Sequence, residues 1–244
     1  MSLALADLKA QFMDTETGEI LYGKMKDSEA FLRYEGLTRG LALFPLESLR
    51  DRAQRLAFWI NVYNAAVIHG VVSLGVKRSV REVRLFFKRV AYRIGGYVFS
   101  LHEMEHGILR GNSRAPYGIL RPFRKRDPRI AFCVEPLDPR IHFAMVCGAR
   151  SCPPVGFYEA QRVDFQLDLA TASFINGPGV KFLPESGVLE LSQIFRWYKW
   201  DFGGMSGIMD LLLKYLDPGQ AREAIARHRT SLPVRFQHYD WDLN

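Results

Sequence analysis

The sequence predicts an α+β fold in which a helical N-terminal half packs on a central, mostly antiparallel sheet, with further helices towards the C-terminus. Helical patterns come first, strand patterns collect between residues 91 and 147, and helical patterns return after residue 164. Of the 244 residues, 48% are hydrophobic, which is enough for a substantial core and excludes a disordered or fibrous protein. No linker or repeat divides the chain, so residues 27–244 are predicted to form a single domain after a lead-in over residues 1–26.

Two helices are expected in the first half. Ser28 is a suitable N-cap for a helix that runs towards Leu41. Pro45 suits the start of a second, longer helix that continues to Val71. A further amphipathic piece is expected over residues 80–90.

The run over residues 56–76 contains no Lys, Arg, Asp or Glu and has the length of a membrane span. Asn61 and Asn64 within it favour a helix buried inside the protein, so we expect no membrane-spanning segment. The two asparagines lie on one side of that helix, and buried amides require hydrogen-bond partners. They are therefore predicted to hold neighbouring backbone in place or to line a binding site.

A tight hairpin is predicted at Gly95-Gly96, which separate two short strand-like segments. Ser100 and Glu103 have the spacing of a capping box, so a helix should begin there. The remaining elements are expected in this order: strands over 129–135 and 141–147, a helix over 164–176, a strand over 187–191, an aromatic-rich helix capped by Ser192, a helix over 207–216 and a strand over 234–241.

Basic residues outnumber acidic ones, 33 against 26, giving a formal net charge of +7. The excess gathers in two clusters, one of Arg78, Arg81, Arg84, Lys88, Arg89 and Arg93 and one of Arg121, Arg124, Lys125, Arg126 and Arg129. Such clusters are often solvated surface, but they can contact nucleic acid, anionic lipid or an acidic partner. The sequence contains no specific nucleic-acid motif.

The cysteines and the N-terminus bear on the cellular compartment. An odd number of cysteines, three, cannot form a fully paired disulfide framework, and free thiols suit a reducing environment. Residues 1–9 lack the apolar core of a secretory signal. The sequence therefore predicts a cytoplasmic protein.

The segment over residues 140–154 is the strongest candidate for a functional site. It carries two thiols, Cys147 and Cys152, together with Arg150 and His142. A nearby cation lowers the pKa of a thiol and so favours the reactive thiolate. Arg150, His142 and His106 are the expected sources of such an effect on Cys152.

The residues around the two thiols restrict how they can react. Cys152 precedes Pro153, which has no amide hydrogen, so helix N-terminal amides are not expected to stabilise a Cys152 thiolate. We expect Gly148 to direct the chain away after Cys147, leaving the two cysteines too far apart to form a disulfide. Cys133, in an apolar strand-like segment, is expected to be inert.

The predicted helix over residues 101–110 places Glu105 on its apolar face, where a carboxylate must find a cation or several donors. His106 and Arg110 lie on the neighbouring face. One interpretation makes His106 a general base that a carboxylate orients. The other makes Glu105 and Arg110 a structural anchor.

His102 and His106 also match the H-E-x-x-H pattern, which can bind zinc through two histidines one helical turn apart. Leu109 and Asn112 occupy the positions where further motif residues would follow. The sequence therefore predicts no bound metal, and it indicates no cofactor.

Five ordered blocks of sequence resemble the domain of unknown function 547 family. They are residues 57–64, 105–110, 142–154, 191–198 and 239–244, so the resemblance runs from about Leu49 to the C-terminus. It implies an uncharacterised domain found in bacteria, plants and other eukaryotes. Some relatives join it to glutaredoxin-like or signalling modules, none of which is recognised in this sequence.

Three hypotheses of function follow. The first is a thiol-dependent hydrolase or transferase, in which Cys152 attacks, His106 moves the proton and Glu105 orients the imidazole. Arg150 would stabilise the developing negative charge. Residues expected to contribute to binding are His142, Cys147, Arg110, Asn61 and Asn64.

The second hypothesis is a non-catalytic module whose basic surface docks acidic partners or membranes. The third is a redox-sensing dithiol made of Cys147 and Cys152. The sequence specifies neither the substrate nor the oligomeric state, and whether the protein is an enzyme stays open at this point.

Overall fold

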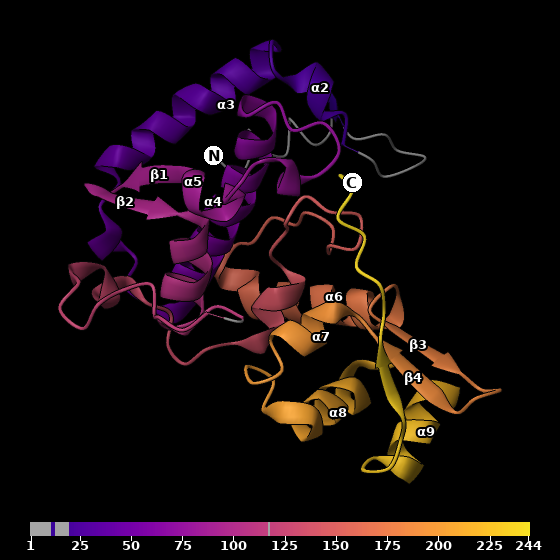
Figure 1. Ribbon diagram of the computed structural model, residues 1–244. Helices are drawn as coiled ribbons and strands as arrows, with labels where there is room; N and C mark the ends of the chain where they lie inside the picture. Colours follow the sequence, from indigo (N-terminus) through magenta and orange to yellow (C-terminus); the bar gives the residue numbers. More distant parts are fainter. Residues whose placement is uncertain (1–10, 13–19, 117) are drawn as a thin grey trace. The chain divides into compact units, whose positions relative to one another are not determined.

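The computed structural model describes residues 11–12, 20–116 and 118–244 (Figure 1). The chain divides into two compact units. The first comprises residues 1–137, 145–163 and 241–244, and the second comprises residues 138–144 and 164–240. The sequence contains no linker at these boundaries, and one domain over residues 27–244 stays a prediction.

The α+β class is confirmed, because helices combine with two small sheets. The first unit holds the helices α2 (Tyr22–Met25), α3 (Glu29–Arg39), α4 (Arg52–Ser73) and α5 (Phe86–Arg89) and several short 3-10 segments. Ser28 caps α3 as predicted, since its side chain accepts a hydrogen bond from the Phe31 amide. Pro45 begins only a 3-10 turn, because the capping box that starts α4 is formed by Asp51 and Gln54.

Helix α4 is the core of the first unit. It is long and apolar enough to cross a membrane, but 83% of its most apolar window is buried within the protein. Trp59, Ile60, Val67 and Val71 are among its fully buried side chains. The expectation of a buried core helix is therefore confirmed.

The predicted hairpin is also present. Strands β1 (Ala91–Ile94) and β2 (Tyr97–Ser100) pair in antiparallel fashion around Gly95 and Gly96, both of which have positive φ. The capping box follows, because the Ser100 amide donates to Glu103 at 2.9 Å and the Glu103 amide donates to Ser100 Oγ at 3.2 Å.

Two predicted strands, over residues 129–135 and 141–147, are wrong. The structure instead begins each segment with a 3-10 helix, Pro128–Phe132 and Pro139–Phe143. The reason is a repeated local motif, Asp-Pro-Arg-Ile-x-Phe, which starts at Asp127 and again at Asp138. In both copies the aspartate caps the turn, proline occupies its first position, and the arginine folds back onto the aspartate.

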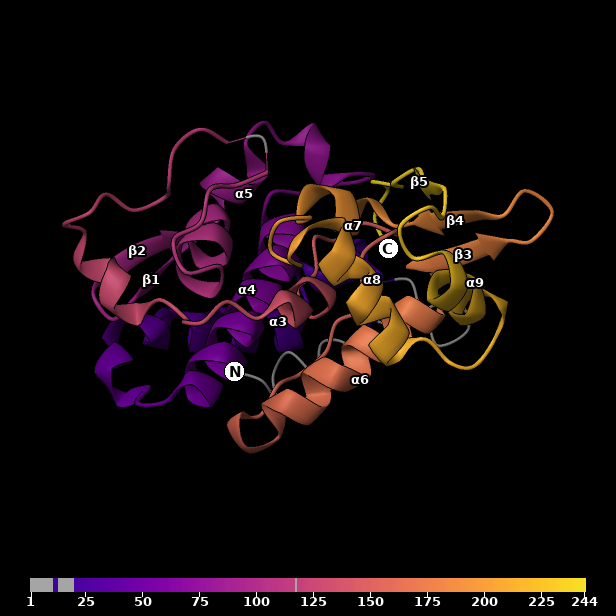
Figure 2. The same cartoon turned by 90° about the horizontal axis from the view of Figure 1, so that it is seen from below.

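The second unit contains a three-stranded sheet with helices. Its elements are α6 (Val163–Asn176), β3 (Val180–Leu183), β4 (Val188–Leu191), α7 (Gln193–Trp197), α8 (Gly204–Tyr215), α9 (Gln220–His228) and β5 (Val234–Phe236). The strand order is β3-β4-β5, antiparallel between β3 and β4 and parallel between β4 and β5. Helix α9 packs on β3 and α8 (Figure 2).

Most of this C-terminal pattern was predictable. The helices over 164–176 and 207–216, the strand at 187–191 and the Ser192 cap are confirmed. Strand β3 and helix α9 were missed. Of the aromatic residues in and after the predicted aromatic-rich helix, Phe195 and Phe202 are buried and pack against Phe143, with ring centroids 5.6 and 5.7 Å away. Trp200, in contrast, is 82% exposed.

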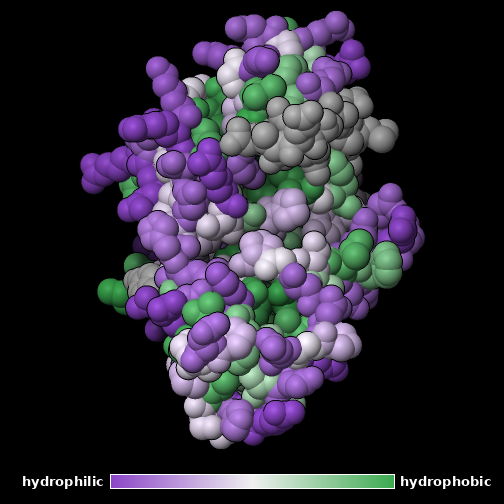
Figure 3. All heavy atoms as spheres, turned by 90° about the vertical axis from the view of Figure 1, so that its right-hand side faces the viewer, coloured by the Kyte–Doolittle hydropathy of each residue, from purple (hydrophilic) through white to green (hydrophobic). Residues whose placement is uncertain are grey.

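Hydrophilic side chains cover most of the face shown in Figure 3, and hydrophobic residues reach the surface in separate patches. The most exposed large hydrophobic side chains include Leu43 at 89%, Ile119 at 82% and Leu120 at 81%. Single exposed apolar residues are ordinary in folded proteins. Ile119 and Leu120 differ because they are adjacent.

Two buried asparagines of α4 fix the loops around it. Asn61 exchanges hydrogen bonds with the backbone of Tyr158, donating at 2.7 Å and accepting at 2.9 Å. Asn64, which is fully buried, accepts a hydrogen bond from the Val146 amide at 3.0 Å. The prediction that both amides are buried and paired is confirmed.

Replacing Asn64 should destabilise the protein. In Asn64→Ala the buried Val146 amide loses its acceptor, which we expect to lower the free energy of unfolding by about 1 to 3 kcal/mol. Urea denaturation of parent and variant measures this difference. Gln220→Ala, which removes an exposed amide, is the control and should change stability by less than about 0.5 kcal/mol. An Asn64→Ala protein as stable as the control would contradict the role assigned to this side chain.

Candidate functional site

The two cysteines of the 140–154 segment lie in direct contact. The Sγ atoms of Cys147 and Cys152 are 2.8 Å apart, and both residues are free thiols with intermediate exposure. A disulfide bond is about 2.05 Å long. A small movement of either side chain would therefore bring the sulfurs to bonding distance.

The expectation that Gly148 keeps the cysteines apart is wrong. Gly148 adopts a φ of +77°, which turns the chain sharply after Cys147. The next four residues form a tight turn, closed by a hydrogen bond from the Cys152 amide to the Ala149 carbonyl at 2.9 Å. Together the two bends bring Cys152 back to Cys147. We call residues 147–152 the dithiol loop.

Cys152 Sγ accepts a hydrogen bond from the Cys147 backbone amide at 2.7 Å. A donor of this kind favours a thiolate over a thiol. The sequence correctly excluded helix N-terminal amides because of Pro153, but it missed an amide from within the same loop. Arg150 is exposed and anchored through its own amide, which donates to the Asp242 carbonyl at 2.8 Å.

Tyr22 completes the surroundings of the thiols. Burial raises its pKa strongly, and negative charge on the nearby Cys152 and Cys147 raises it further. The phenol therefore stays neutral at physiological pH. It donates to Asn244 Oδ1 at 2.9 Å. Neither residue was predicted to lie at the site, because nothing in the local sequence of Tyr22 or Asn244 indicates that the two meet.

The C-terminal segment holds the dithiol loop in place. Ala149 and Leu243 form an antiparallel β-bridge, and the Asn244 amide donates to the Gly148 carbonyl at 3.3 Å. The chain positions of these partners differ by more than ninety residues. The shape of the loop thus depends on a distant segment.

A cleft of about 540 Å³ lies next to this group, in the first unit. Tyr22 and Asn244 line it, as do the basic residues Lys26, Lys77 and Arg150. Val71, Val72 and Val76 supply an apolar part of the wall. The cleft therefore combines positive charge with an apolar surface.

The predicted acid-base group forms a second cluster, also in the first unit. Its backbone is a π-helix, Glu103–Leu109, a rare conformation that often occurs at functional sites. Glu105 is buried and accepts a hydrogen bond from the Tyr63 hydroxyl at 3.0 Å, so the expected donor is present. Glu105 Oε1 also lies 3.5 Å from His106 Nδ1.

Arg110 determines where His106 carries its proton. An Arg110 guanidinium nitrogen lies 3.0 Å from His106 Nδ1, and a guanidinium can only donate. Nδ1 must therefore accept, and a neutral His106 carries its proton on Nε2. In this arrangement Nε2 can donate a hydrogen bond but cannot accept a proton.

His142 lies in the second unit. Its Nε2 is 2.8 Å from an Asp201 carboxylate oxygen, and its ring stacks on Tyr198 with centroids 3.8 Å apart. These contacts give it a buried aspartate partner. Its predicted contribution to thiol chemistry stays a prediction.

The H-E-x-x-H residues lie close together, with the rings of His102 and His106 4.8 Å apart. Burial and the nearby Lys88 lower the pKa of His102. Among the described residues, no group of three or more His, Cys, Asp or Glu side chains has the arrangement of a metal site.

Cys133 differs from Cys147 and Cys152 in its exposure and in its surroundings. It is buried, and its Sγ lies 3.2 Å from the Gly107 carbonyl, to which it donates. Burial raises the pKa of this thiol to about 11. The surrounding segment is not the expected strand, and the inertness of Cys133 stays a prediction, which its burial and raised pKa support.

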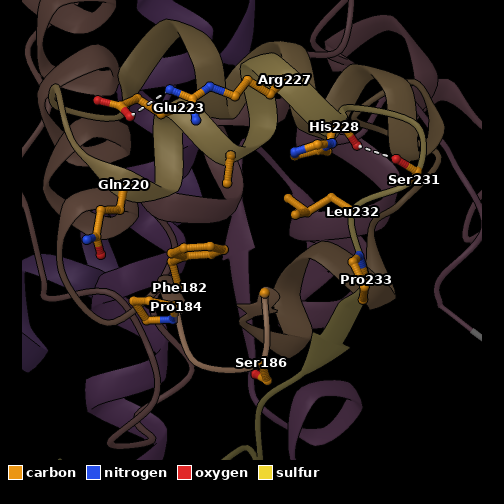
Figure 4. A pocket seen from close by; sticks show the side chains of 12 residues that line it. Phe182, Pro184, Ser186, Gln220, Glu223, Arg227, His228, Ser231, Leu232 and Pro233 are labelled. Carbon is orange, nitrogen blue, oxygen red and sulfur yellow. Dashed lines mark hydrogen bonds and ion pairs between the residues drawn. The ribbon is translucent and has the colours of Figure 1, made fainter.

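A further cleft of about 600 Å³ lies in the second unit, between α9 and the β3–β4 turn (Figure 4). Phe182 and Leu232 line its apolar part. Glu223 and Arg227 lie on its rim and form an ion pair at 3.5 Å, so they neutralise each other. Sequence reasoning did not identify this cleft.

Comparison with known proteins gives a family and no function. No curated protein and no solved structure matches the chain significantly. A family model described as "Protein of unknown function, DUF547" matches residues 46–175, more than half of the chain and a range that includes both the dithiol loop and the π-helix. The matched range contains three of the five sequence blocks, and a match over more than half of the chain shows that the chain belongs to the DUF547 family.

Proposed function

We propose that the dithiol loop carries out thiol–disulfide exchange, with Cys147 and Cys152 as a reversible dithiol/disulfide pair. The observation that carries the proposal is the 2.8 Å separation of the two sulfur atoms. Intermediate exposure gives a small substrate access to the thiols. A backbone amide donates to Cys152 Sγ, and such a donor favours the thiolate that exchange requires.

The reaction needs a disulfide substrate as oxidant. The Cys152 thiolate attacks one substrate sulfur, forms a mixed disulfide and releases the other substrate sulfur as a thiolate. Cys147 then loses its proton and attacks Cys152 Sγ, which breaks the mixed disulfide and releases the second substrate thiolate. Two protons give two substrate thiols, and two electrons pass from the protein dithiol to the substrate.

The roles of the two cysteines follow from their contacts. Cys152 receives the backbone amide at 2.7 Å, which supports its role as attacking thiolate. Cys147 lies in position to resolve the mixed disulfide. Tyr22 remains neutral, so it adds no negative charge that would oppose formation of the thiolate.

A thiol-dependent hydrolase or transferase using Cys152, His106, Glu105 and Arg150 is the second candidate. It requires His106 to accept a proton, whereas the hydrogen bond from Arg110 occupies Nδ1 and leaves the proton on Nε2. Arg110 would have to move before His106 could act as a base. The dithiol proposal needs no such rearrangement, so we rank it first.

Exchange predicts a defined product. The reduced protein, incubated with excess 2-hydroxyethyl disulfide, should form an intramolecular bond between Cys147 and Cys152, and dithiothreitol should reverse it. Peptide mass spectrometry identifies the bond. Cys147→Ser should instead accumulate a mixed disulfide on Cys152, because the resolving thiol is absent. Cys133→Ser is the control and should behave like the parent. A parent protein that stays fully reduced would refute the proposal.

Alkylation should distinguish the three thiols. In the reduced protein, iodoacetamide should modify Cys152 first, with a pH midpoint below the value of about 8.5 for free cysteine, because the Cys147 amide stabilises the thiolate. Cys133 should resist modification until the pH approaches its pKa of about 11. Arg150→Ala should raise the Cys152 midpoint if its guanidinium adds to that stabilisation. Equal and slow labelling of all three cysteines would indicate a structural loop.

A further inference from the structure

A second feature of the first unit concerns the loop over residues 118–126. Its tip carries Ile119 and Leu120, which are 82% and 81% exposed. Two adjacent aliphatic side chains that project this far leave apolar surface in water at a cost in free energy. The proposed thiol–disulfide exchange assigns no role to Ile119 or Leu120.

The rest of the loop is basic. Arg121, Arg124, Lys125 and Arg126 are all exposed, and residues 118–126 contain no Asp or Glu. The next acidic residue, Asp127, is held by Arg129, whose guanidinium bonds both its carboxylate oxygens. The loop therefore presents four positive charges directly beside its apolar tip.

The base of the loop is firmly anchored. Phe123 is buried against Gly107 of the π-helix, where an added Cβ would lie only 2.5 Å from the phenyl ring. Asn112 exchanges two hydrogen bonds with the Phe123 backbone, at 3.0 and 3.1 Å. The Arg129 guanidinium covers the ring at 4.4 Å. These contacts hold the loop so that its tip faces outwards.

We propose that residues 118–126 form a docking loop for anionic membrane surfaces. Ile119 and Leu120 would enter the boundary between headgroups and acyl chains, while the four basic residues contact anionic headgroups. Basic side chains alone would also suit nucleic acid. The apolar tip favours the membrane, because a phosphate backbone offers no apolar layer in which two aliphatic side chains could be buried.

Vesicle co-sedimentation tests this proposal. The reduced, full chain should bind phosphatidylcholine vesicles that contain phosphatidylserine and should bind pure phosphatidylcholine much more weakly. Added salt should weaken binding, because part of it is electrostatic. Ile119→Ser/Leu120→Ser and Arg124→Gln/Lys125→Gln/Arg126→Gln should each lower the partition coefficient about tenfold or more.

Two matched variants control for general effects of apolar or charged surface. Leu43→Ser removes a leucine that is 89% exposed elsewhere in the first unit. Lys24→Gln/Arg33→Gln/Arg39→Gln removes three exposed basic side chains from α2 and α3. Both should bind vesicles like the parent, and circular dichroism confirms that every variant is folded.

The outcomes separate lipid from nucleic acid. Loss of vesicle binding in the two loop variants, with both controls unchanged, supports the proposal. Equal binding by all variants, or no preference for phosphatidylserine, overturns it. A fluorescent DNA or RNA duplex is tested in parallel by anisotropy. Duplex binding that needs the basic residues but not Ile119 and Leu120, without vesicle binding, would also overturn it in favour of a nucleic-acid surface.

Discussion

The burial of α4 is the constraint on which the first unit depends. From Leu56 to Ser73 this helix contains no Lys, Arg, Asp or Glu, and buried asparagine side chains form its hydrogen bonds to the backbone of neighbouring loops. Asn61 holds Tyr158 and Asn64 holds Val146, each by backbone hydrogen bonds. Because Val146 directly precedes Cys147, Asn64 helps to position the dithiol loop, together with the C-terminal segment that pairs with Gly148, Ala149 and Arg150.

The sequence predicts those parts of the fold that local chemistry determines. Ser28, Ser100 and Ser192 each cap an element as expected, and Gly95-Gly96 form the hairpin. The sequence predicts the wrong secondary structure where an apolar run and a capping motif favour different elements. At Asp138 the Asp-Pro-Arg motif overrides the apolar residues after it, and a 3-10 helix replaces the expected central strand.

The candidate site shows the same division between local and distant information. Cys147, Cys152 and the buried Glu105 were identifiable from their own neighbours in the sequence. Contact between the thiols required the positive φ of Gly148, the turn that follows it and the bridge from Ala149 to Leu243. No periodicity or spacing encodes such a bridge, because it depends on how distant segments pack.

The dithiol loop and the docking loop rest on one continuous scaffold. Phe123 fixes the docking loop against Gly107 of the π-helix, and Glu105 of the same π-helix accepts the hydroxyl of Tyr63 in α4. The residue after Tyr63 is Asn64, which positions the dithiol loop.

This arrangement accounts for a buried carboxylate and histidine without assigning them catalysis. Where the π-helix meets α4, Tyr63 donates a hydrogen bond to Glu105 and Arg110 donates one to His106. Buried polar contacts of this kind favour one packing arrangement. Contacts that adopt a single arrangement can hold two sites in position. They do not transmit a signal between the sites, because signalling requires an element with two states. The cluster therefore has a structural role: it connects the π-helix to α4, and these two elements position the docking loop and the dithiol loop.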